Sequence, residues 1–199
     1  MDTLKAEKRD MSIKAKRLRR EGYVTGNVFG RRIEGSIPVK IVRTEAERLL
    51  KTKNKGSQIM LDVDGELYDV LIKEIDFNSM KGQSEEIDFQ ALVSEEKVHS
   101  VAEVVLLNHD KLVGGIVSQV LHEIPYMALP AALVEKVEID LEKLRVGDVV
   151  KVGDLPLASD KDIELKVGLD EVVLSVTMPH NADAEEDAPA EETAGTAEK

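Results

Sequence analysis

A cluster of cationic side chains near the amino-terminal end is the feature of this sequence best suited to chemistry. Five of the seven residues from Lys14 to Arg20 are Lys or Arg. A cation that neutralises a phosphate releases condensed counterions, and the planar guanidinium of Arg adds a two-pronged hydrogen bond. The spacing therefore favours binding of a phosphate-rich polymer. A solvated basic helix or loop without a ligand has the same composition, so charge alone leaves both interpretations open.

Residue patterns for other chemistries are incomplete. The four histidines form neither an HExxH motif nor a close pair, two common signatures of a zinc site. Asp62, Asp64 and Asp69 lack the closing Glu of a calcium loop. The sequence contains no glycine-rich phosphate loop and no nucleophile elbow. We therefore expect no metal, no cofactor, no small-molecule substrate and no enzymatic activity.

Composition narrows the class of protein further. The chain has 199 residues, of which 42% are hydrophobic and 3% are aromatic, with no Trp and no Cys. Such a core depends on Val, Ile and Leu. Aromatic base-stacking surfaces are largely excluded, and the lack of Cys excludes disulfides. No apolar segment approaches the roughly 18–20 residues of a membrane span, and no apolar leader follows the start. We expect a cytoplasmic protein that does not contact membranes.

Charge is distributed unevenly along the chain. The net charge is −12, yet residues 1–55 contain 16 Lys and Arg against 7 Asp and Glu. Residues 94–180 contain 8 cationic against 16 acidic residues, and residues 181–199 contain 1 against 7. A local basic field can attract a polyanion to an acidic protein. The amino-terminal part is therefore the one expected to meet nucleic acid.

The surrounding sequence predicts mainly β structure with a little α-helix. Alternation on both sides of Asp64-Gly65 predicts a hairpin over 61–72. One helix is expected from Thr44, capped by its hydroxyl and ended by Gly56. Alternation over 117–124 predicts a strand that Pro125 terminates. Further strands are predicted at 37–42, 87–93, 98–107, 137–141, 149–152 and 172–178.

This spacing of short strands and turns is typical of an antiparallel barrel or sandwich. The polar segment 94–97 suggests a boundary between a β-barrel RNA-binding domain, residues 1–93, and a β-rich carboxy-terminal domain, residues 94–180. Residues 181–199 have no large apolar side chain, which predicts a disordered acidic tail.

Several motifs in this order resemble those of the large-subunit ribosomal protein L-twenty-five family, in its two-domain form known as general stress protein CTC. The resemblance covers about 180 residues. In the first half it depends on 5–9, 17–22, Phe29-Gly30, 70–74 and 87–90; in the second it depends on 114–117, 120–124, 129–130, 144–148 and 170–173.

The resemblance implies an amino-terminal antiparallel β-barrel that binds 5S rRNA, followed by a second β-rich domain. It implies a structural role in the large ribosomal subunit, next to that subunit's other proteins, and a ribosome-associated location in the cytoplasm. Carried over position by position, the implied RNA contacts are Arg9, Lys14, Lys16, Arg17, Arg19, Arg20 and Asp88.

Two departures from the family pattern support an alternative hypothesis. The segment before Arg17 lacks the family's glycines, and Glu86 occupies the place of a usual His. A glycine permits close approach to a phosphate, and a carboxylate repels one. The alternative is a diverged member that acts as a stress-response or protein-interaction module without binding the ribosome.

Overall fold

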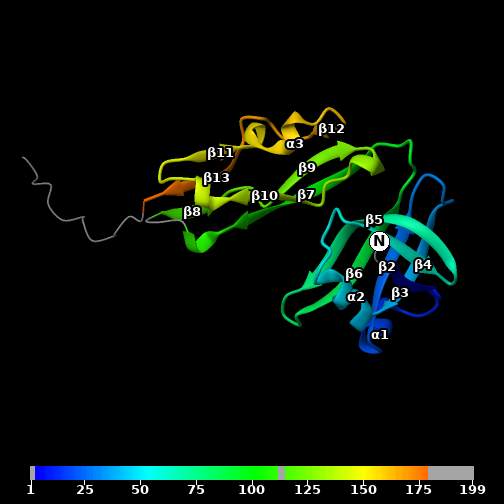
Figure 1. Cartoon of the computed structure of the whole chain (residues 1–199). Helices are drawn as coiled ribbons and strands as arrows, with labels where there is room; N and C mark the ends of the chain where they lie inside the picture. The colour runs from blue at the N-terminus through cyan, green and yellow to red at the C-terminus, as the bar shows by residue number, and fades with distance from the viewer. Residues whose placement is uncertain (1–2, 112–114, 179–199) are drawn as a thin grey trace, which may run out of the picture.

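The computed structural model describes residues 3–111 and 115–178, which form a closed barrel and a second β-rich region (Figure 1). The predicted tail over 181–199 lies outside the described residues. The barrel strands are β1 (Thr3–Lys8), β2 (Tyr23–Phe29), β3 (Ser36–Val42), β4 (Gln58–Val63), β5 (Glu66–Asn78) and β6 (Gln83–Ala91).

The barrel closes in the order β1-β3-β2-β6-β5-β4. Most neighbours are antiparallel, but β1 pairs with β4 and β2 with β6 in parallel. The β2–β6 contact requires Gly26, because a Cβ there would lie 2.0 Å from the Ile87 carbonyl oxygen. The predicted hairpin is confirmed: β4 and β5 pair across Asp64 and Gly65, both with positive φ.

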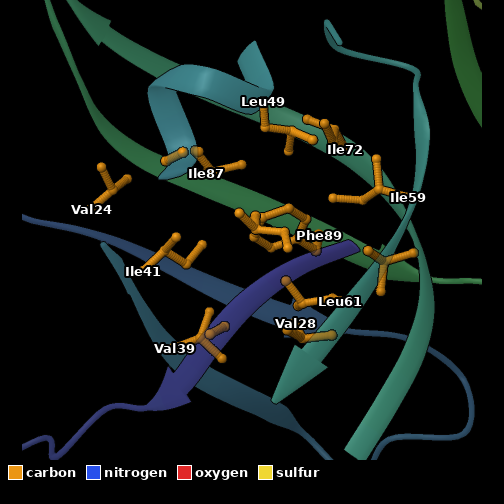
Figure 2. Packing of buried hydrophobic residues seen from close by; sticks show 14 of the residues in the cluster. Val24, Val28, Val39, Ile41, Leu49, Ile59, Leu61, Ile72, Ile87 and Phe89 are labelled. Carbon is orange, nitrogen blue, oxygen red and sulfur yellow. The ribbon is translucent and has the colours of Figure 1, made fainter. Parts of the chain in front are cut away.

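A largely aliphatic core fills the barrel, with Phe89 at its centre (Figure 2). Side chains from neighbouring strands, among them Ile41, Leu61 and Ile72, surround the ring and are at most 1% exposed. The pattern follows from alternation, since every second residue of a barrel strand points inward. The outward residues are therefore free to carry the charge.

Two helices pack on this barrel. Helix α1 (Ala15–Arg20) is formed by the cationic segment itself and is anchored by Leu18, which is 4% exposed. Helix α2 (Arg43–Leu50) begins one residue before the predicted Thr44 cap. That prediction is wrong, because Val42 is the capping residue and no side chain caps the helix. The predicted stop is also wrong, since α2 ends six residues before Gly56.

The second region contains a four-stranded and a three-stranded sheet. Their orders are β10-β7-β9-β12 and β11-β13-β8. The strands are β7 (Val98–Leu107), β8 (Ile116–Gln119), β9 (Glu123–Ala128), β10 (Lys136–Asp140), β11 (Val149–Lys151), β12 (Ile163–Leu165) and β13 (Val172–Thr177). The described part of this region also contains a short helix, α3 (Pro156–Ser159), and four one-turn 3-10 helices: His109–Lys111, Pro130–Ala132, Leu141–Lys143 and Val152–Asp154.

The single strand predicted over 117–124 is wrong. The chain leaves the three-stranded sheet after β8 and enters the four-stranded one at β9, and both Val120 and Leu121 donate to the Val173 carbonyl at this crossing. Pro125 lies inside β9 and does not terminate it. Its carbonyl accepts from the Lys166 N–H just beyond β12, so Pro125 lies where the β9–β12 pairing ends and a missing N–H interrupts no further pairs.

Candidate nucleic-acid interface

Helix α1 presents its cations to solvent on one side of the barrel. Lys16, Arg17 and Arg20 are exposed, and so is Lys14 at the residue preceding the helix. The helix is short, and Leu18 anchors it on the barrel, which leaves Lys16, Arg17 and Arg20 pointing outward. The carboxyl end is held by Arg43, whose guanidinium donates to the Arg19 carbonyl. The same carbonyl accepts from the Gly22 N–H at 3.4 Å, so both bonds help to satisfy the carboxyl end of the helix.

Arg19 behaves differently from its neighbours on α1. Its Nη1 lies 3.1 Å from Glu85 Oε2, its Nη2 lies 3.1 Å from Glu86 Oε2, and its Nε donates to the Glu85 carbonyl. The Arg19 side chain is 26% exposed. Three donors of one guanidinium are therefore used within the protein. Arg19 ties α1 to β6, and a phosphate there would have to displace two carboxylates.

Glu85 is the centre of this network. Its other carboxylate oxygen accepts from Asn78 Nδ2 at 2.8 Å and from Lys81 Nζ at 2.9 Å. The hydrogen bonds from Lys81 and then Asn78 lower the pKa of Glu85 below its ordinary value. The carboxylate thus stays ionised and fixes the β5–β6 hairpin beside α1. An open cleft of about 410 Å³ lies between them, lined by Lys16, Arg19, Arg20, Arg43, Lys81, Gln83 and Glu85.

Arg9 lies just before α1 and Asp88 lies on β6, and both are partly used by the fold. Arg9 donates through Nη2 to the Ile13 carbonyl at 3.2 Å, and this bond folds the connection between β1 and α1. Asp88 Oδ1 accepts from the backbone N–H and the side chain of Asn27, at 3.1 and 3.3 Å. Asp88 and Glu86 share the outward face of β6.

The structure thus gathers the cationic candidates around α1 and adds neighbours that the sequence did not indicate. Arg43, Lys81 and Glu85 come from distant segments, and only the pairing of β2 with β3 and of β5 with β6 brings them there. Within the described residues, the ion pairs of the α1 cations are Arg17–Glu21 and Arg19 with Glu85 and Glu86. Lys14, Lys16 and Arg20 form none there.

Two family models match the chain in succession. The Ribosomal L25p family matches residues 4–89, and the C-terminal domain of ribosomal protein TL5 matches residues 97–180. A protein of Caldanaerobacter subterraneus named large ribosomal subunit protein bL25 is 31% identical over an alignment of 201 positions, gaps included, that spans 98% of each chain. A Bacillus licheniformis protein of the same name is 30% identical over 190 residues, 94% of this chain and 90% of its own.

The chain belongs to the ribosomal L25p family. The two successive matches correspond to its two-domain form, as the resemblance implied. The L25p family consists of structural ribosomal proteins and not of enzymes. Among the residues that the structure describes, no group of three metal-ligating side chains and no helix capable of crossing a membrane is found.

Proposed function

We propose that this L25p protein is a structural component of the large ribosomal subunit and that it binds 5S rRNA through α1. The relatives are named as proteins of that subunit, which supports the coarser part of the proposal. The finer part is carried by one observation: four cations on or next to α1 are exposed, and three of them form no ion pair within the described residues. Exposed cations keep the counterion-releasing capacity that phosphate binding uses.

The cations have separate roles in this proposal. Lys14, Lys16, Arg17 and Arg20 contact phosphates, and Arg17 does so by exchanging its exposed bond to Glu21. Arg19 acts as a positioning residue, because its guanidinium holds α1 on β6. Asp88 and Arg9 complete the edge of the surface. Recognition is mainly of backbone shape, since RNA helices expose phosphates and 2′-hydroxyls more readily than base edges.

The test is filter binding of 5S rRNA by the full chain across a salt series. Lys16, Arg17 and Arg20 are replaced together by Ala, and the matched control replaces the exposed Lys136, Lys143 and Lys161 of the second region. Both triple variants lose the same charge. The slope of log affinity against log salt should fall by about one unit per phosphate contact in the α1 variant only.

Equal losses in both variants would show a nonspecific charge effect and reject α1 as the interface. Absence of 5S rRNA binding by the wild type would favour the alternative, a diverged module that does not bind the ribosome. That alternative has a specific observation behind it, since Glu85 and Glu86 already occupy Arg19.

A further inference from the structure

The segment after α2 reaches out of the barrel and contacts the second region. Lys53 Nζ lies 2.9 and 3.0 Å from the two carboxylate oxygens of Glu135, and Asn54 Nδ2 lies 2.6 Å from Glu103 Oε2. The Lys53 and Glu135 side chains are only 20% and 33% exposed. A partly buried pair with two hydrogen bonds restricts geometry more strongly than a surface pair does.

Gly56 brings the two backbones into direct contact. A Cβ at this position would lie 2.2 Å from the Val101 carbonyl oxygen of β7, and Gly56 has a φ of +87°. On its other side, the Gly56 N–H donates to the Ile72 carbonyl of β5 at 2.8 Å. Gly56 is thus enclosed between a barrel strand and a strand of the second region. Only a residue without a side chain fits between them.

Further contacts extend this interface along β5. Lys73 Nζ donates to the His99 carbonyl at 2.8 Å, and Lys55 Nζ lies 3.6 Å from Glu123 Oε2. Leu71 of β5 is 1% exposed although it lies outside the barrel's core cluster. It lines a small cavity together with Val101 and other residues of the second region. Apolar burial and polar bonds therefore lie side by side.

The charges across this interface are complementary. The barrel contributes Lys53, Lys55 and Lys73, and the second region contributes Glu103, Glu123 and Glu135 besides backbone carbonyls. The segment 94–97 that joins the two parts along the chain is not needed for these bonds. The contacts are thus a second, noncovalent connection between them.

We propose that residues 53–56 and Lys73 of β5, together called the docking residues, hold the second region in one fixed orientation on the barrel in the free protein. The two parts then tumble as one body, with the acidic second region extending away from the side that carries α1 (Figure 1). A fixed acidic arm keeps its charge away from an anion bound at α1. The proposal itself does not depend on RNA binding.

The test uses residual dipolar couplings of the full chain without RNA. In the wild type, the couplings of the barrel and of the second region should fit a single alignment tensor. Gly56→Val should require two tensors, because its side chain cannot fit against Val101. Gly65→Val is the matched control: Gly65 also has positive φ, at +93°, but its added Cβ meets nothing within 4 Å.

A charge exchange gives a second measurement that does not depend on folding of the glycine variant. Lys53→Glu should separate the two tensors, and adding Glu135→Lys should restore the single one. Two tensors in the wild type would overturn the proposal. So would a Lys53→Glu variant that keeps one tensor, or a Gly56→Val variant that behaves like Gly65→Val.

Discussion

Two groups of cations on the same barrel have opposite surroundings. The α1 cations, Lys14, Lys16, Arg17 and Arg20, face solvent, and the Arg17 side chain is 73% exposed. The docking cations, Lys53, Lys55 and Lys73, face the second region, and the Lys53 side chain is 20% exposed. The cations of the barrel therefore include some that are available to a ligand and others that are already used inside the protein.

The difference shows that a binding surface is defined by cations without an acceptor inside the protein, and not by the number of cations in a segment. A docking cation has exchanged water for a carboxylate or carbonyl, so an RNA phosphate would have to replace that partner. An exposed α1 cation exchanges only water and counterions. The same argument separates Arg19 from its neighbours, since its partners come from β6.

The largest expected effect is a loss of stability on disrupting the core of the barrel, which carries both groups of cations. Phe89→Ala should lower the free energy of unfolding by about 3–5 kcal/mol, because it empties the centre of the barrel. Phe77→Ala is the control, since that ring is 55% exposed and should change stability by less than about 0.5 kcal/mol. Urea unfolding measures both. Equal losses would contradict the description of the core.

The Lys53–Glu135 contact should contribute less to the free energy of unfolding than the Phe89 side chain does. A double-mutant cycle with Lys53→Ala and Glu135→Ala should give a coupling energy of about 1 kcal/mol in urea unfolding. The control cycle uses Lys111 and Glu142, whose side chains are 55% and 53% exposed although their atoms lie closer, at 2.6 Å. Its coupling should be a few tenths of a kcal/mol. A larger coupling energy in the control would mean that the distance between the charged atoms, and not burial, determines the strength of these ion pairs, which would contradict this account.

The Glu85 network should give a titration shift. The carboxyl carbon signal of Glu85 should titrate below the ordinary value of 4.5, and Lys81→Met should raise the pKa toward it because Lys81 is the main cause of the lowering. A lowered folded pKa means that the network stabilises the protein above the unfolded pKa. This contribution is lost as pH falls through the folded pKa. An unchanged pKa in the variant would contradict the network.

The smallest expected effect is a change in RNA affinity on breaking the ion pair of Arg17 with Glu21. Glu21→Gln removes the Arg17–Glu21 pair, an exposed i,i+4 pair worth about 0.3–0.5 kcal/mol. If Arg17 contacts phosphate, its release should raise affinity for 5S rRNA by about twofold. Glu47→Gln, on α2, carries the same charge change and serves as the control. An equal rise in both would indicate general electrostatics.

The sequence pattern predicts those turns and strands that depend on neighbouring residues alone. The Asp64-Gly65 turn and the strands over 98–107 and 137–141 were readable from turn residues and alternation. Strand β2 was not predicted, because Thr25, Gly26 and Asn27 resemble a turn. Gly26 is there because β6 approaches its backbone, and that approach exists only in the closed barrel.

The candidate site divides in the same way. The cationic character of Lys14 to Arg20 is visible in one segment of sequence, as is the absence of an aromatic stacking surface. The pairing of Arg19 with Glu85 and Glu86 joins residues 66 and 67 positions apart. The docking cations find their carboxylates up to 82 positions away. Such partners depend on strand order, which no local pattern encodes.

The proposed role of the α1 cations is tested most directly by co-sedimentation, at moderate salt, with large ribosomal subunits prepared from cells that lack this protein, so that its site on the subunit is vacant. The wild type and the Lys136, Lys143, Lys161 triple-Ala control should sediment with the subunits at near-unit stoichiometry, and the Lys16, Arg17, Arg20 triple-Ala variant should remain largely in the supernatant. Equal sedimentation of all three, or of none, would contradict the assignment of α1 as the surface that binds ribosomal RNA.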